Sequence, residues 1–160
     1  MDNFSLDEII DMAVQIEKNG YCFYDRALQR SDLDLKSRDL ITMLRNDEIT
    51  HERTFESLRD QIDNKAVFKS GDWNTIGSYL RIIADSHIFS AENSAINMAV
   101  NARDFKQIMF YAIAFEKDTL LYFYSLEKYV DDEKTKQTIA KIIDEEASHI
   151  MRLKNFLREI

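Results

Sequence analysis

DEITH at residues 47–51 and EEASH at residues 145–149 share one pattern, an acid followed by Glu-x-x-His. A Glu-Lys pair precedes each motif, at residues 17–18 in the first case and 116–117 in the second. The interval from the first Glu to the Glu of the motif is 31 residues in the first half and 30 in the second. Self-similarity of this kind indicates two structurally related halves. The repeated Glu and His residues predict one metal-binding site to which both halves contribute.

The composition predicts an all-α protein with one domain, residues 1–160. A chain of 160 residues is long enough to bury a sizeable core without disulfides. It contains 3 glycines and no proline, so few residues oppose long helices. A single cysteine excludes a disulfide framework and an internal four-cysteine iron site.

The charge and hydropathy of the chain narrow its expected partners. A formal net charge of −8 disfavours binding to nucleic acid. The first residues show neither the basic segment nor the apolar run of a secretory signal, and no stretch approaches the roughly 18 apolar residues of a membrane span. We therefore expect a cytoplasmic protein that binds neither membranes nor nucleic acid.

Apolar residues that recur every three or four positions predict four long helices. Between the second and third of these, over residues 65–90, the pattern weakens and glycines interrupt it, which predicts a long crossover. A further helical stretch begins near Ala91, and Asn101 and Asp104 predict a break after it. The four expected helices lie approximately at residues 6–29, 35–64, 105–130 and 132–160.

The repeated polar residues lie on the apolar faces of these helices. At about 100° per residue, Glu48 lies about 40° from Leu44, and His51 lies about 20° to its other side. The fourth helix repeats this arrangement around Ile142. The residues predicted to share one interior as metal ligands are Glu17, Glu48, His51, Glu116, Glu146 and His149.

Four buried carboxylates need cations or protons for compensation. Each uncompensated charge would cost several kcal/mol even after the protein relaxes. Two divalent ions would balance the four carboxylates. Mixed oxygen and imidazole ligands suit iron or manganese, and zinc is also possible.

With this ligand pattern, the chain resembles the ferritin-like di-iron carboxylate superfamily, and within it the rubrerythrin-like branch. The resemblance covers the whole chain and implies an antiparallel four-helix bundle with one long crossover between helices 2 and 3. It implies two iron ions, with Glu48 and Glu146 bridging them. Glu17 and Glu116 would be terminal ligands, and each histidine would bind one ion. A tyrosine that contacts a ligand carboxylate in rubrerythrins matches Tyr24, and Tyr124 is expected to play the mirrored part.

The resemblance also implies an activity. We expect an oxidoreductase that reacts with O2 or hydrogen peroxide, either oxidising iron or reducing peroxide. The alternative is a non-catalytic helical bundle that binds or handles iron. Rubrerythrins carry a cysteine-ligated iron domain that supplies electrons. The single cysteine of this sequence cannot form such a site, so the electron donor is expected to be a separate molecule. They also carry an additional Glu where this chain has Thr119, which counts against peroxide reduction.

Several other polar and aromatic residues are expected to serve structural roles. Glu52 and Glu145 are next to predicted ligands but point away from the apolar face, so we expect them to be solvated. His87 and Glu92 fall in or near the crossover and are expected at the surface or at helix caps. The aromatic residues of the third helix exceed the needs of one core face, which predicts a homodimer interface. These are Phe110, Tyr111, Phe115, Tyr122 and Tyr129.

Overall fold

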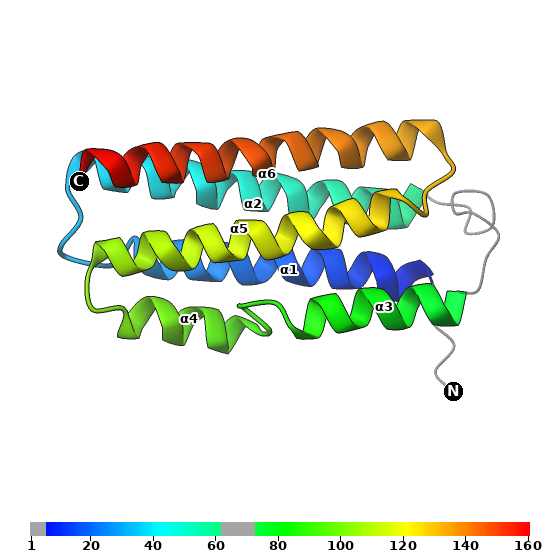
Figure 1. Ribbon diagram of the computed structural model, residues 1–160, viewed down its shortest axis with the longest axis horizontal. Coiled ribbons are helices and arrows are strands. Elements are labelled where there is room, and N and C mark those ends of the chain that lie inside the picture. The colour runs from blue at the N-terminus through cyan, green and yellow to red at the C-terminus, as the bar shows by residue number, and fades with distance from the viewer. Residues whose placement is uncertain (1–5, 62–72) are drawn as a thin grey trace.

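The computed structural model describes residues 6–61 and 73–160 of the chain. These residues form six α-helices, four of them long, which confirms the predicted all-α class (Figure 1). Their bounds are α1 Leu6–Ala27, α2 Leu35–Gln61, α3 Trp73–Asp85, α4 Glu92–Asn101, α5 Phe105–Glu127 and α6 Glu133–Glu159.

The four long helices pair in the order of the chain. α1 packs against α2 and α5 against α6, each pair antiparallel and joined by a short connection (Figure 1). α2 and α5 begin at the same end of the bundle, as a long crossover between them requires (Figure 1). The expected arrangement is therefore confirmed, and the two halves of the repeated sequence face each other across the bundle.

The crossover contains more helix than the sequence pattern predicted. α3 and α4 follow one another along α1 and α5 (Figure 1). In α3, Ile76, Leu80 and Ile83 are buried, and this burial outweighs the weak helix propensity around Gly77. α4 ends at Asn101, where the break was predicted. The predicted end of the second helix at residue 64 and the glycine at position 71 lie outside the described residues.

Acidic caps fix where three long helices begin. Before α2, the Asp34 carboxylate accepts a hydrogen bond of 2.8 Å from the Ser37 amide. Asp104 caps α5 through the Gln107 amide, and Asp132 caps α6 through Thr135. Each carboxylate satisfies an amide that would otherwise lack a partner in the first helical turn.

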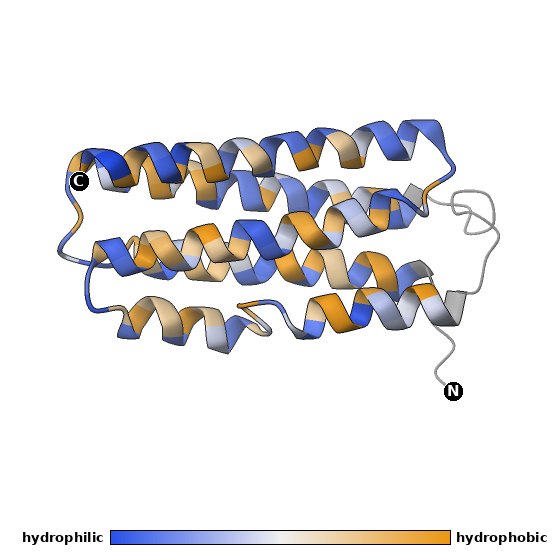
Figure 2. Cartoon of the chain, in the orientation of Figure 1, coloured by the Kyte–Doolittle hydropathy of each residue, from blue (hydrophilic) through white to orange (hydrophobic). Residues whose placement is uncertain are grey.

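The core lies between the two helix pairs and continues beneath α3 and α4. Apolar residues follow the facing sides of the helices, and polar residues cover the outer side of α6 (Figure 2). Phe115 and Tyr122 are completely buried, so the prediction that they belong to an outer face of this helix is wrong. The reason is that the crossover covers part of α5. Phe110, Leu121 and Tyr124 remain about half exposed, and a homodimer through this face stays a prediction.

The sequence analysis expects no membrane-spanning segment, and the hydropathy of the helices can be compared with this expectation. Among residues 6–61 and 73–160, none of the helices combines the length and apolar character needed to cross a membrane.

Candidate metal centre

The six predicted ligands come together at mid-bundle. α1 supplies Glu17 and α5 supplies Glu116, one residue from each helix that begins a half. The two Glu-x-x-His motifs supply the rest, from α2 and α6. All six residues are at most 2 % exposed. The helical periodicity that predicted their convergence is thus matched by the tertiary structure.

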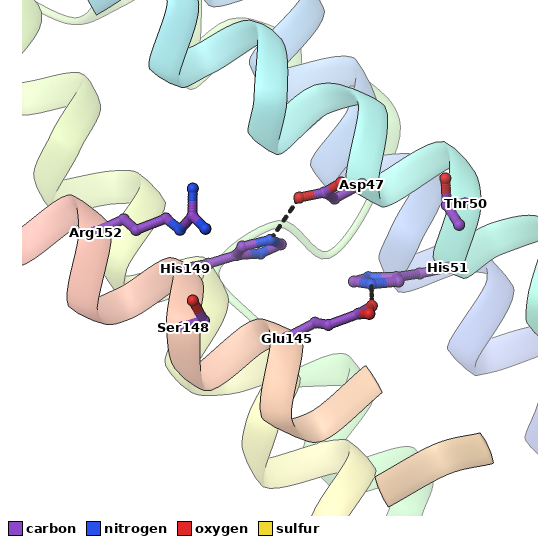
Figure 3. A pocket seen from close by; sticks show the side chains of 7 residues that line it. All are labelled: Asp47, Thr50, His51, Glu145, Ser148, His149 and Arg152. Atoms are coloured by element: carbon purple, nitrogen blue, oxygen red, sulfur yellow. Dashed lines mark hydrogen bonds and ion pairs between the residues drawn. The ribbon is translucent and has the colours of Figure 1, made fainter. Parts of the chain in front are cut away.

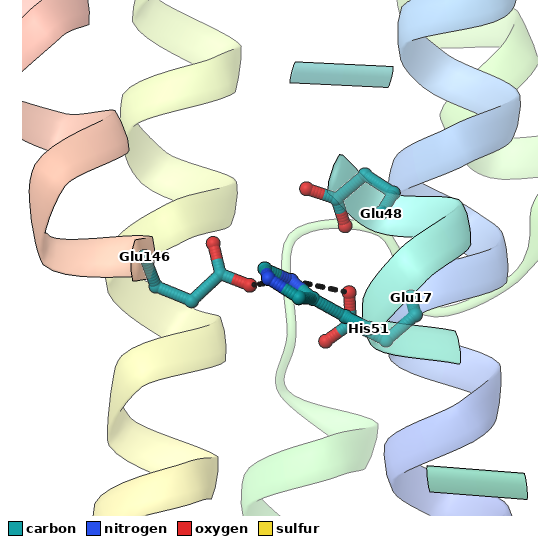
Figure 4. A group of neighbouring side chains, drawn as sticks. All are labelled: Glu17, Glu48, His51 and Glu146. Atoms are coloured by element: carbon teal, nitrogen blue, oxygen red, sulfur yellow. Dashed lines mark ion pairs between the residues drawn. The ribbon is translucent and has the colours of Figure 1, made fainter. Parts of the chain in front are cut away.

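These residues form two overlapping groups. One contains Glu17 and His51 and the other contains Glu116 and His149, and both contain Glu48 and Glu146. Within each group, one ligand atom from each residue lies within 4.8 Å of the others. Figure 4 shows the first group, with His51 between Glu146 and Glu17. Two such groups with two shared carboxylates fit a pair of metal ions.

The cluster leaves polar atoms without partners. Among the described residues, every buried side-chain oxygen or nitrogen without a hydrogen bond belongs to this cluster. Buried polar groups in native proteins are nearly always paired, because an unpaired one loses its hydration without compensation. The unpaired atoms are both carboxylate oxygens of Glu17 and of Glu48, Nδ1 of His51, Oε2 of Glu116 and Oε1 of Glu146.

Each histidine points one ring nitrogen into the cluster and the other out of it. Nδ1 of His51 lies 2.8 Å from Glu146 Oε1, and Nδ1 of His149 lies 2.9 Å from Glu146 Oε2. On the outer side, His51 Nε2 lies 2.8 Å from Glu145, and His149 Nε2 lies 3.0 Å from Asp47 (Figure 3). An outer carboxylate that holds Nε2–H leaves Nδ1 free to bind a metal.

This outer pairing corrects the expectation for Glu145. Its side chain is 43 % exposed, yet it contacts His51 and is not simply solvated. The pairing is reciprocal, because the first acid of each motif holds the histidine of the other. The repeated acid in front of each Glu-x-x-His is the sequence signal for this role, which helical periodicity alone did not predict. Glu52 instead forms an outer ion pair of 3.7 Å with Lys18.

A polar pocket of about 200 Å³ opens between α2 and α6. The two imidazoles form part of its wall, together with the outer acids that hold them (Figure 3). The rings stack with centroids 6.0 Å apart. This pocket brings solvent to the outer edge of both histidines. Its lining residues are Asp47, Thr50, His51, Glu145, Ser148, His149 and Arg152.

The two tyrosines expected near the ligands have different positions. The Tyr24 hydroxyl is buried and donates a hydrogen bond of 2.5 Å to Glu116 Oε1. Tyr124 is 49 % exposed on α5, so its expected mirrored role is wrong. The residue seven positions after Glu17 is Tyr24. The residue seven positions after Glu116 is Phe123, which has no hydroxyl group. The tyrosine contact therefore exists in one half alone.

Burial and mutual repulsion change the acidity of the carboxylates. Burial, reinforced by the neighbouring Glu146, raises the pKa of Glu17 and raises that of Glu116 to about 8. Burial also raises the pKa of Glu48, with Glu17 and Glu146 adding to the effect. Without cations, Glu116 would hold its proton near neutral pH, and Glu17 and Glu48 would keep theirs to a higher pH than an ordinary carboxyl group.

Glu146 behaves differently, although burial alone would raise its pKa. Contacts with His149 and His51 hold that pKa below its usual range. The contact with His51 is short but is not aligned as a hydrogen bond, so His149 is the firmer cause. Burial alone would lower the histidine pKa values, but the surrounding carboxylates raise them to about 11 for His51 and about 12 for His149.

A glycine allows α1 to approach the cluster. A Cβ atom at Gly20 would lie 2.6 Å from Glu48 Oε2 and 2.3 Å from Cζ of Phe115. Both distances are shorter than real Cβ contacts. Gly20 is thus required for the carboxylate of Glu48 and the ring of Phe115 to occupy their positions.

Comparison with known proteins supports the fold. One crystal structure superposes with a TM-score of 0.67 and covers 99 % of this chain and 98 % of its own, at 20 % sequence identity. It is described as a candidate ferritin-like diiron-carboxylate protein from Thermotoga maritima. No family model and no curated protein matches the chain. At this identity the likeness shows a ferritin-like fold.

We expect Gly20→Ala to destabilise the protein. Helix propensity alone would favour the substitution by about 1 kcal/mol, but overpacking against Phe115 typically costs about 1–3 kcal/mol. Chemical denaturation followed by circular dichroism measures the balance. A Phe115→Leu background removes the clashing ring atoms, so Gly20→Ala should cost less there. Equal costs in the two backgrounds would contradict the clash.

We expect the metal-free protein to lose stability as the pH rises from about 5 to about 8. The native pKa of Glu116 is about 8 against an ordinary 4.5, and those of His51 and His149 lie far above 6.5. The buried His87, with a native pKa of about 4, offsets one of these protons below about pH 6.5, but the raised pKa of Glu48 adds another. The native state therefore holds more protons than the unfolded chain in this interval, and stability falls with pH under that condition. Thermal melts across the interval test this sign. A melting temperature that rises with pH would contradict the protonated cluster.

Proposed function

We propose that the chain is a di-iron carboxylate protein that reacts with O2 or hydrogen peroxide. The observation that carries this proposal is the collection of unpaired buried atoms, all on the six clustered residues within the described part of the chain. Two divalent ions would supply partners for these atoms and balance four carboxylates. The description of the Thermotoga maritima structure as a diiron-carboxylate protein, together with the mixed oxygen and imidazole donor set, favours iron.

The two groups suggest a role for each ligand. Glu17 and His51 would hold one ion, and Glu116 and His149 would hold the other. Glu48 and Glu146, which both groups share, would bridge them. Manganese or zinc would find the same donors.

Iron supplies one-electron redox chemistry with O2 or peroxide, and the protein residues would set its surroundings. Tyr24 holds one oxygen of Glu116 and restricts how that carboxylate can turn. Asp47 and Glu145 hold the imidazoles in the orientation that directs Nδ1 inward. Peroxide reduction would require electrons from a separate donor, whereas iron oxidation would take them from Fe(II) itself.

A non-catalytic role in iron handling is the second candidate. The polar pocket favours it, because the partly exposed carboxylates of Asp47 and Glu145 lie at the outer edge of the cluster, where an incoming cation would first meet negative charge. Both roles need the same six ligands. They differ in whether the bound iron reacts rapidly with an oxidant.

We expect the purified protein to bind two first-row divalent ions per chain. Glu48→Ala and Glu146→Ala should each weaken the binding of both ions, because each Glu is proposed to bridge the two ions. His51→Ala and His149→Ala should each weaken the binding of mainly one ion. Equilibrium dialysis with metal analysis measures both stoichiometry and affinity, and Glu52→Ala is a matched control on the outer face of α2. If Glu48→Ala retains two tightly bound ions, the bridging assignment is wrong.

We expect Fe(II)-loaded protein to form a ferric absorption band after mixing with O2 or hydrogen peroxide in a stopped-flow instrument. Rapid formation at a rate well above that of free Fe(II) supports the oxidoreductase role. Two bound irons that oxidise no faster than free Fe(II) would leave iron handling as the function. Comparison of the two oxidants distinguishes iron oxidation by O2 from peroxide reduction.

A further inference from the structure

The connection between α3 and α4 places a buried histidine beside the metal centre. His87 is 4 % exposed, which contradicts its expected surface position. Its Nε2 lies 3.1 Å from the hydroxyl of Thr119, and its ring packs edge-on against Phe115. Next to it, the Ile88 amide donates a hydrogen bond of 2.8 Å to Asp118. The connection is therefore fixed to α5 one turn beyond Glu116.

The hydrogen bonds of His87 define which nitrogen carries its proton. The Phe89 amide lies 3.3 Å from Nδ1 and donates to it. Burial lowers the pKa of His87 to about 4, so the ring is neutral at physiological pH. With Nδ1 as acceptor, Nε2 carries the hydrogen and donates it to the oxygen of Thr119. Both nitrogens are thus engaged, and His87 has none left to bind a metal.

The proton of the Thr119 hydroxyl then needs an acceptor of its own. Several other helical hydroxyl groups donate to the carbonyl four residues earlier, namely those of Thr50, Thr54, Ser125 and Thr138. In the described part of the chain, Thr119 has a hydrogen-bond contact with His87 alone. The side chain of Thr119 is completely buried, so surface water cannot accept its hydroxyl proton. A buried donor without an acceptor is costly.

Thr119 lies on the same helix face as one of the clustered carboxylates. Residues three apart on a helix are neighbours on one face, so Thr119 lies beside Glu116. Three residues after Glu17, the equivalent position in the other half is Gly20, whose backbone lies against Glu48. At this position, three residues after a buried Glu of the cluster, one half therefore has a hydroxyl group and the other has no side chain.

We propose that the Thr119 hydroxyl, oriented by His87, donates a hydrogen bond to a small anionic or oxygen ligand bound at the metal pair. Thr119 would contact the ligand, and His87 would be a positioning residue. This inference rests on the proposed function, because the ligand requires the two metal ions. The ligand class includes water, hydroxide and small oxidants with an accepting oxygen.

The test uses Co(II)-loaded protein with azide as the probe, since visible absorption reports azide binding without any turnover. We expect Thr119→Val to raise the azide dissociation constant about tenfold, as expected for the loss of a hydrogen bond to a charged acceptor. Thr119→Ser keeps the hydroxyl and should bind azide like the wild type. His87→Phe should raise the azide dissociation constant by a smaller factor. Thr54→Val is the control, because that hydroxyl is bonded to its own helix.

The outcomes separate this inference from the proposed function. Wild-type protein that fails to bind two Co(II) ions overturns both. Two bound ions with equal azide affinity in wild type and Thr119→Val overturn this inference and leave the metal centre intact. If Thr119→Val loses Co(II), His87→Phe decides, and unchanged azide affinity there overturns the proposal. A weaker azide affinity in Thr119→Val, restored in Thr119→Ser, supports it.

Discussion

Burial of four carboxylates in an apolar interior is the constraint on which the rest of the structure depends. Each buried carboxylate loses its hydration, and few hydrogen bonds replace it at this cluster. The fold can hold such a cluster in two ways, by protonation or by binding cations. The raised pKa values of Glu17, Glu48 and Glu116 describe the first state, and the two overlapping ligand groups provide for the second. Metal binding at this cluster would therefore stabilise the fold.

The two sides of the cluster offer different surroundings. Toward α2 and α6, the histidines face a polar pocket, and partly exposed acids hold their outer nitrogens. Toward α1 and α5, the connection between α3 and α4 covers the cluster, and Phe89 packs on Phe23 and Phe115. The first side is polar and partly open to solvent. The other excludes water, which strengthens each hydrogen bond formed there.

The internal repeat is a near symmetry with chemically important exceptions. Tyr24 holds Glu116, whereas the position equivalent to Tyr24 is the phenylalanine Phe123. Gly20 brings backbone against Glu48, whereas Thr119 at the equivalent position brings a hydroxyl. The same six ligands thus have unequal neighbours in the two halves. Such inequality would make the two metal positions differ in affinity and in the ligands they accept.

The sequence by itself determined the helical class, the pairing of long helices and the six converging side chains, because helical periodicity places a residue on a face regardless of the partner helix. Tertiary structure alone decided what each side chain meets. The reciprocal contacts of Asp47 and Glu145 join helices about a hundred residues apart, and the burial of His87 depends on where the crossover lies. Periodicity along one helix carries no information about distances between helices, which is why these contacts required the folded chain.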